Sequence, residues 1–335
     1  MKKRLFFITI TTVTAMASCA SSGEKKSNVA VNDTIINGKE ITTASNIEEV
    51  VAAKNDTTDI AQVKAEAKAG KSQVKDINFH SKVLNANREY TIYLPPTYHS
   101  AKDRHYPILY LLHGMLDDNR CWTRRAHLQE VADELIAKGE MREMIIVTPC
   151  AGGVENKDWN GYFNMPGWQY ETFFMKEFMP YIESHYRVMG DKAHRGVAGL
   201  SMGGGAATSY AQRYTDLFCG VYAMSALMDI VPLPGHKAGP KSMVGLFSKS
   251  VADLATPKFV RNANEQTRQQ LRTIQWYVDC GDHDFLLQKN KDFVAEMKKA
   301  NIPLTVKYRP GKHSWQYWHS GLYIMLPFIT KCMKP

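Results

Sequence analysis

Short apolar runs alternate with amphipathic segments from residue 88 to the C-terminus. The apolar runs are typical of buried β-strands, which we expect at residues 88–94, 106–112, 144–148, 195–198, 218–224, 274–279 and 304–308. Helical periodicity predicts helices at residues 128–138, 170–186 (interrupted at Pro180), 287–300 and 315–332. Because apolar strands alternating with helices form parallel sheets, the pattern predicts an α/β fold: a mostly parallel central sheet with helices on both faces.

The first 19 residues have the form of an export signal. A basic start is followed by an apolar and threonine-rich stretch, too short for a transmembrane helix, and by small residues before Cys19. This ending resembles a bacterial lipoprotein signal, in which Cys19 carries the lipid. Plain secretion is the alternative, because Met16 is unusual at the head of such a cleavage box. In either case we expect an extracytoplasmic protein, either membrane-anchored (facing the periplasm or at the cell surface) or secreted.

Residues 20–74 are polar, contain no aromatic side chain and predict a flexible tether. Residues 75–335 have the length of a single α/β domain. Within that domain, residues 228–272 break the strand–helix alternation and are rich in proline, glycine and lysine. We expect this segment to form a cap or lid over a site.

Composition narrows the choice of partners. The chain carries a net charge of +9, but its lysines and arginines are scattered, so we expect no nucleic-acid partner. The six cysteines lack any Cys-x-x-Cys spacing. A disulfide is permitted outside the cytoplasm, but the spacing assigns no pairing.

Residues 199–204 read Gly-Leu-Ser-Met-Gly-Gly, between an apolar run and a helix of small residues. Strand, sharp turn and helix with Gly-x-Ser-x-Gly at the turn form the nucleophile-elbow pattern, in which a strained backbone projects a serine hydroxyl clear of the sheet. Small residues must flank that serine because other chain segments crowd the turn. We therefore expect Ser201 to be a nucleophile. The alternative is an N-capping serine at a glycine-rich helix start.

A serine nucleophile needs a base and an acid that holds the base; after an elbow they follow as Asp or Glu and then His. His313, in a Pro-Gly turn between the last expected strand and helix, is the predicted base. Asp284, shortly after the strand at 274–279, is the predicted acid, with Asp282 as its rival. For the other histidines we expect structural roles.

Two backbone amides are expected to stabilise an oxyanion. One belongs to Met202 at the start of the elbow helix, and the other to Met115, after His113-Gly114 at the end of an apolar strand. Substrate contacts are predicted for five aromatic residues, namely Trp122, Trp159, Tyr162, Trp315 and Trp318, which suit a sugar ring or a phenolic acyl group. The alternative for these aromatics is burial in the core.

Five motifs occur in order: Tyr-Leu-Pro-Pro-x-Tyr at 93–98, Leu-Leu-His-Gly at 111–114, the turn at 199–204, Cys-Gly-x-x-Asp at 280–284 and Gly-x-His-x-x-x-x-Trp at 311–318. Together they resemble the esterase D-like esterase family. That family includes feruloyl and acetyl xylan esterases of carbohydrate esterase family 1, S-formylglutathione hydrolases, enterochelin esterases and mycolyltransferases. The resemblance covers roughly residues 74 to 335. It implies an α/β-hydrolase fold and a serine esterase without metal or cofactor, with Ser201, His313 and Asp284 as its triad.

The activity we expect is removal of feruloyl or acetyl groups from plant cell-wall polysaccharide, in particular xylan. The partners would then be an acylated polysaccharide or oligosaccharide and, through the lipid anchor, a membrane. One alternative is an esterase or acyltransferase for siderophore-like or other small esters. Another is a non-catalytic glycan-binding lipoprotein on the same fold. An extracytoplasmic location argues against formylglutathione, which is a cytosolic metabolite.

Overall fold

The structure is a computed structural model that describes residues 70–152, 161–231 and 239–335. The expected signal peptide, the expected lipid site at Cys19 and residues 20–69 of the expected tether lie outside the described residues. Within the described ranges, no helix combines the length and apolarity needed to span a membrane.

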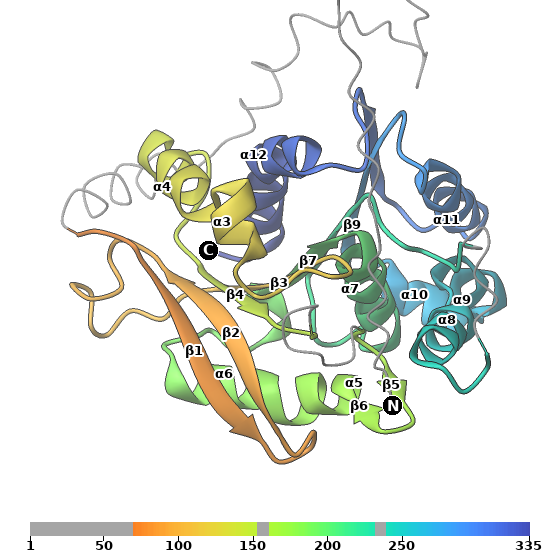
Figure 1. The fold of residues 1–335 in the computed structure, drawn as a ribbon. Helices are drawn as coiled ribbons and strands as arrows, with labels where there is room; N and C mark the ends of the chain where they lie inside the picture. The colour runs from red at the N-terminus through yellow and green to blue at the C-terminus, as the bar shows by residue number, and fades with distance from the viewer. Residues whose placement is uncertain (1–69, 153–160, 232–238) are drawn as a thin grey trace, which may run out of the picture. The chain divides into compact units, whose positions relative to one another are not determined.

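An eight-stranded sheet organises the described chain, in the order β1-β2-β4-β3-β7-β8-β9-β10 (Figure 1). From β4 to β10 every neighbouring pair is parallel, whereas β2 pairs antiparallel with both β1 and β4. The expected mostly parallel sheet is therefore confirmed. The strands are β1 (Gln73–Ser81), β2 (Ala86–Leu94), β3 (Ile108–Leu112), β4 (Ile145–Pro149), β7 (Arg195–Leu200), β8 (Gly220–Met224), β9 (Gln275–Gly281) and β10 (Thr305–Arg309), and a separate two-stranded sheet joins β5 (Asn164–Met165) and β6 (Trp168–Gln169).

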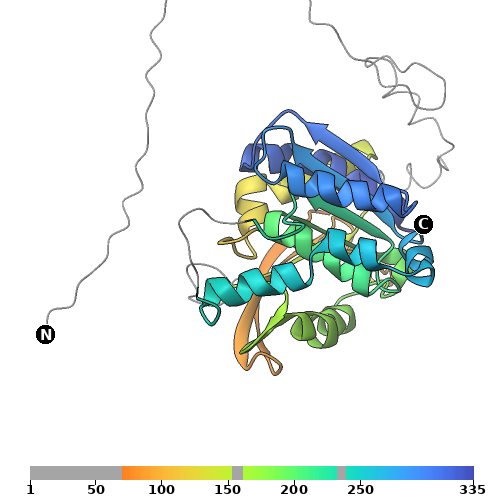
Figure 2. The same cartoon turned by 90° about the vertical axis from the view of Figure 1, so that its right-hand side faces the viewer.

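Helices pack on both faces of the sheet, as expected (Figures 1 and 2). They are α3 (Cys121–Ala126), α4 (Leu128–Lys138), α5 (Tyr170–Phe173), the π-helix η1 (Phe174–Phe178), α6 (Met179–His185), the 3₁₀ turn η2 (Lys192–His194), α7 (Ser201–Arg213), α8 (Met243–Asp253), α9 (Thr256–Asn262), α10 (Glu265–Leu271), α11 (Leu287–Lys299) and α12 (Trp315–Cys332).

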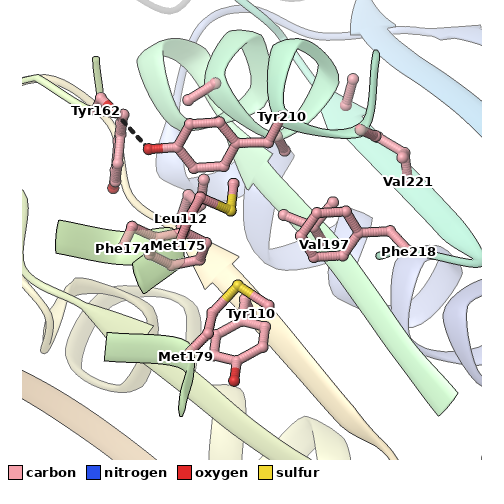
Figure 3. Close-up of a cluster of buried hydrophobic side chains, with 14 of the residues drawn as sticks. Tyr110, Leu112, Tyr162, Phe174, Met175, Met179, Val197, Tyr210, Phe218 and Val221 are labelled. Carbon is pink, nitrogen blue, oxygen red and sulfur yellow. Dashed lines mark hydrogen bonds between the residues drawn. The ribbon is translucent and has the colours of Figure 1, made fainter. Parts of the chain in front are cut away.

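Each face of the sheet has its own hydrophobic core, because successive side chains of a strand point to opposite faces. Along β3, Ile108, Tyr110 and Leu112 belong to one core, and Leu109 and Leu111 to the other. The first core, shown in part in Figure 3, includes side chains of α5–α6, α7, α9 and α11. The second includes side chains of α3, α4 and α12. Burial on both faces explains why these strands read as continuous apolar runs.

The helix expected at 170–186 forms, but with a π-helical turn at its centre. Pro180 falls in the first turn of α6, directly after that turn. Proline has no N–H to donate to the preceding turn and its ring crowds the carbonyl there, and a widened turn accommodates both effects.

The sequence pattern did not predict β1, α3 or the helices of the expected lid. Residues 73 and 74 belong to β1, so the expected tether boundary at residue 74 is two residues too late. Within 228–272 lie α8, α9 and α10, which bury Val251, Val260 and Leu271 in the first core. Residues 232–238 of the same segment lie outside the described residues.

The carboxyl ends of the parallel strands reach the same edge of the sheet. Leu112 of β3 pairs with Gly199 of β7, Leu200 pairs with Met224 of β8, and Met224 pairs with Asp279 of β9. The loops that follow β3, β7, β9 and β10 therefore converge, and they carry the residues singled out as candidate chemistry.

Candidate active site

Ser201 is the first residue of α7 and directly follows β7. Its φ of 51° lies in the left-handed region, which is sterically unfavourable for any residue with a Cβ. A Cβ at Gly203 would lie 2.5 Å from the carbonyl oxygens of both Leu112 and His113, and one at Gly199 would lie 2.5 Å from the Gly203 backbone. The chain after β3 thus presses against the turn, and glycine is required at both positions.

The structure brings Ser201, His313 and Asp284 together. His313, in the loop between β10 and α12, has its Nε2 3.0 Å from Ser201 Oγ. Its Nδ1 lies 2.8 and 3.0 Å from the two carboxylate oxygens of Asp284. A proton on Nδ1 is donated to Asp284, which leaves Nε2 free to accept the serine proton. Asp284 is buried and also accepts the Leu286 N–H at 2.8 Å, so its carboxylate is fixed.

Asp282, the rival acid, contacts the histidine loop elsewhere. Its Oδ1 accepts the Gly311 N–H at 3.0 Å and lies 2.6 Å from His283 Nδ1. Both contacts favour the carboxylate and lower the pKa of Asp282. The His283 N–H in turn donates to the Gly311 carbonyl at 3.0 Å. Asp282 therefore joins the loop of Asp284 to the loop of His313, whereas the His313 ring itself bonds to Asp284.

A buried polar cluster around Asp279, which sequence reasoning missed, supports the same loop. Arg309 of β10 donates to both carboxylate oxygens of Asp279, with its Nη2 at 2.7 Å. The hydroxyls of Tyr222 and Tyr317 also donate to Asp279. These bonds join β8, β9, β10 and α12 on either side of His313. The sequence signal that could have revealed this cluster is Asp279 itself, a charged residue inside an otherwise largely apolar strand.

The Gly114–Met115 peptide lies beside the nucleophile: a Cβ on Gly114 would be 3.7 Å from Ser201 Cβ. Its carbonyl accepts from His113 Nδ1 at 2.7 Å and from the Asp117 N–H at 3.3 Å. The N–H of Met115 belongs to this same peptide plane, which is trans, and so points away from those donors. Anchoring the carbonyl therefore sets the direction of the amide that was expected to face an oxyanion.

His113 performs this anchoring as a neutral ring. It is fully buried, and its Nε2 accepts the Ala151 N–H at 2.9 Å, so the proton must sit on Nδ1. Burial lowers the pKa of His113 to about 4. The second expected amide, that of Met202, lies in the first turn of α7, where backbone N–H groups have no partner within the helix.

Ser201 and His313 open onto a cavity of about 850 Å³ with a mostly apolar lining. Met115 and Met202 line it, as do Trp315 and Trp318 among the predicted substrate residues. Further apolar lining that sequence reasoning missed comes from the segment after β8, from α8 and from the loop after β9, namely Leu227, Ile230, Val231, Met243, Val244, Phe247 and Phe285. The expected covering of the site by segment 228–272 is therefore provided in part by α8.

Two of the predicted substrate contacts are wrong. Trp122 is completely buried, with its ring edge-on to Trp315 at 5.9 Å. Tyr162 is 1% exposed, and its hydroxyl accepts the His113 N–H at 2.7 Å and donates to the His113 carbonyl at 3.1 Å. Tyr162 thus braces the loop that carries Met115 and does not face a ligand. Trp159 lies outside the described residues.

Comparison with known proteins agrees with this geometry. Residues 81–329 match the family model Esterase, described as "Putative esterase". A solved structure named ferulic acid esterase is 51% identical with a TM-score of 0.76, and the match covers 79% of this chain and 99% of that one. An acetyl esterase of Caldicellulosiruptor saccharolyticus is 24% identical over 77% of this chain and 98% of its own.

The endo-1,4-beta-xylanase Y of Acetivibrio thermocellus is 30% identical over 73% of this chain, but the match spans 22% of that longer protein. The family match covers most of the chain, including the strands and loops that carry Ser201, Asp284 and His313. The chain therefore belongs to the Esterase family, has the α/β-hydrolase fold and is a carboxylic ester hydrolase.

Proposed function

We propose that the protein cleaves feruloyl or acetyl esters on xylan with Ser201, His313 and Asp284 as its catalytic triad. His313 Nε2 takes the hydroxyl proton as Ser201 Oγ bonds to the ester carbonyl carbon. Asp284 holds the imidazole in the required tautomer and stabilises the imidazolium. The carbonyl oxygen becomes an oxyanion, which accepts hydrogen bonds from the Met115 and Met202 amides.

The tetrahedral intermediate then collapses, and the bond between the acyl carbon and the alcohol oxygen breaks. The alcohol leaves with the proton from His313, and the acyl group remains on Ser201. In the second half, His313 takes a proton from water as the water oxygen attacks the acyl carbon. Release of the carboxylic acid returns the proton to Ser201. The observation that carries this mechanism is the pair of 3.0 and 2.8 Å contacts of the His313 ring, to Ser201 and Asp284.

The cavity supports an aromatic acyl group as the preferred substrate. A volume of about 850 Å³ falls within the range of small-molecule sites and far exceeds what an acetyl group fills. Apolar side chains of α8 and of the segment after β8 suit a phenylpropenoyl group. Similarity to proteins named ferulic acid esterase, acetyl esterase and xylanase supports xylan as the source of the ester.

Hydrolysis of methyl ferulate, acetylated xylan and p-nitrophenyl acetate by the purified protein tests the proposal. We expect turnover of all three, with the highest kcat/KM on the feruloyl ester. Ser201→Ala should lower kcat by about 10⁴-fold or more, while the exposed Ser184→Ala on α6 should leave it unchanged. Full turnover by Ser201→Ala, or no turnover of any of the three esters, would refute the function.

We further propose that Cys19 carries a lipid that anchors the enzyme to a membrane. The support is the sequence alone: small residues and a cysteine follow an apolar stretch. Cell fractionation tests it, because Cys19→Ser should move the enzyme from the membrane to the soluble or secreted fraction. Equal membrane recovery of both forms would refute lipid anchoring.

A further inference from the structure

The cavity at Ser201 has two walls of different chemistry. One wall consists of apolar residues from the segment after β8 and from α8, with Ser248 of α8 as its one polar side chain among the described residues. The other contains Asp117, Arg125, Ser314 and Gln316 together with Trp315. Apart from the titratable His313, Asp117 and Arg125 are the only ionisable side chains among the described residues that line the cavity.

The two walls lie on opposite faces of the sheet edge. Phe247 of α8 packs against the first core, whereas Trp315 at the start of α12 packs against the second. Ser201 stands between them, at the end of β7. When the carbonyl carbon of an ester lies at Ser201, its acyl group and its alcohol group therefore extend toward different walls. The different chemistry of the walls can then favour one orientation of the ester.

Arg125 is held in place on this polar wall by two neighbours. Its guanidinium carbon lies 4.7 Å from the centre of the Trp315 ring, and its Nη1 donates to Asp117 Oδ1 at 3.1 Å. Within the described part of the chain the guanidinium makes this one hydrogen bond, so Nε and Nη2 keep their donors available. Arg125 covers one face of the Trp315 ring, so this face contacts the guanidinium. The sequence had instead predicted a contact of Trp315 with the substrate, such as a sugar ring.

Asp117 brings an acceptor close to the reaction centre. Its Oδ2 would lie 3.1 Å from a Cβ placed on Gly114, which is itself next to Ser201. The Asp117 side chain is 13% exposed and that of Arg125 56%. An ion pair with one partner this exposed contributes little to stability. A stabilising role therefore does not account for the pairing of Arg125 with Asp117.

We infer that Asp117 and Arg125 form the subsite for the sugar that leaves as the alcohol, with the acyl group against the apolar wall. The inference rests on the proposed feruloyl esterase function. Sugar hydroxyls need both donors and acceptors when they lose water, and only the polar wall supplies them in charged form. A planar guanidinium with free donors beside a carboxylate matches two neighbouring hydroxyl groups.

The test compares two substrates with the same acyl group: methyl ferulate and a feruloylated arabinoxylo-oligosaccharide. The measured quantity is the ratio of kcat/KM on the oligosaccharide to kcat/KM on the methyl ester. Arg125→Ala should lower this ratio about tenfold, because hydrogen bonds to a charged group are lost on one substrate only. Arg125→Lys should recover part of the loss, and Asp117→Asn should lower the ratio in the same direction.

Arg124→Ala is the matched control. Arg124 precedes Arg125 on α3 and pairs with Asp118, but it does not line the cavity, so the ratio should stay at the wild-type value. A thermal melt of each variant shows whether it folds. An unchanged ratio in folded Arg125→Ala, or equal losses on both substrates, would overturn the subsite. Failure of the wild type to hydrolyse either feruloyl ester would instead overturn the proposed function, and the subsite with it.

Discussion

Replacing His113 by Asn or by Leu separates its hydrogen bond to Gly114 from its other roles. The two replacements have the same branched skeleton, but only Asn keeps a donor at the position of Nδ1. Both lose the ring nitrogen that accepts the Ala151 N–H. A buried N–H left without a partner costs about 1–3 kcal/mol in either variant, so this destabilisation cancels in the comparison.

The magnitude follows from what remains on the Gly114 carbonyl. The Gly114 carbonyl accepts from two donors, His113 Nδ1 at 2.7 Å and the Asp117 N–H at 3.3 Å. Loss of His113 leaves only the longer and weaker of these two hydrogen bonds. Complete loss of one oxyanion donor lowers kcat by about 10²–10³-fold. Partial release of the peptide should cost about one hydrogen bond, near 1.4 kcal/mol, which is about tenfold in rate. We therefore expect His113→Leu to be about tenfold slower than His113→Asn.

The assay is kcat on p-nitrophenyl acetate, whose small acyl group makes little use of the cavity walls. Urea denaturation of both variants checks that each is folded and that their stabilities agree. If folded His113→Leu and His113→Asn have kcat values within twofold of each other, the His113 donor does not set the direction of the Met115 amide.

Three other outcomes are expected. Asp284→Asn should lower kcat by about 10⁴-fold, because His313 loses the tautomer that it needs as a base. Asp282→Asn keeps an oxygen that accepts the Gly311 N–H, so its kcat should stay within about threefold of the wild type. Equal losses in the two variants would mean that the acid is misassigned. Arg309→Ala leaves the buried Asp279 carboxylate without its cation and should lower the free energy of unfolding by about 3 kcal/mol in urea titrations; a change below about 1 kcal/mol would contradict the paired geometry. For His113, the unfolded chain takes up a proton near the ordinary histidine pKa of 6.5 but the folded chain only at about 4, so stability should fall as the pH drops through this window. Between pH 7 and pH 5 this effect should lower the free energy of unfolding by about 2 kcal/mol. The same pH dependence of stability in the wild type and in His113→Asn would exclude it.

The order of elements around the site was readable from the sequence because burial leaves a clear pattern. Strands such as β3 and β7 are apolar on both faces, and the turn at 199–204 needs glycines that only close backbone contact explains. β1 left a weaker trace: its three apolar residues, Val74, Ile77 and Phe79, are only partly buried against the cores and stand among polar neighbours. The helices of segment 228–272 were hidden by its proline and glycine content.

The roles of single side chains were harder to predict, because composition does not say which way a side chain points. Trp122 and Tyr162 have the chemistry of a substrate platform, yet the structure turns both into the interior. The chain order of serine, acid and base pointed to Ser201 and His313, but the preference for Asp284 over Asp282 also needed its position after the turn and the family resemblance. The pairing of Arg125 with Asp117, eight residues earlier, and its seat on Trp315 depend on tertiary packing that no local pattern records.

Fluorophosphonate labelling of the purified protein, followed by peptide mapping, tests the central claim most directly. An activated nucleophile reacts and an ordinary serine does not, so we predict a single adduct, on Ser201, that forms in the native protein and not after unfolding. The adduct should form far more slowly in His313→Ala, which removes the base. Labelling at another residue, or an equal rate at Ser201 without His313, would contradict the account.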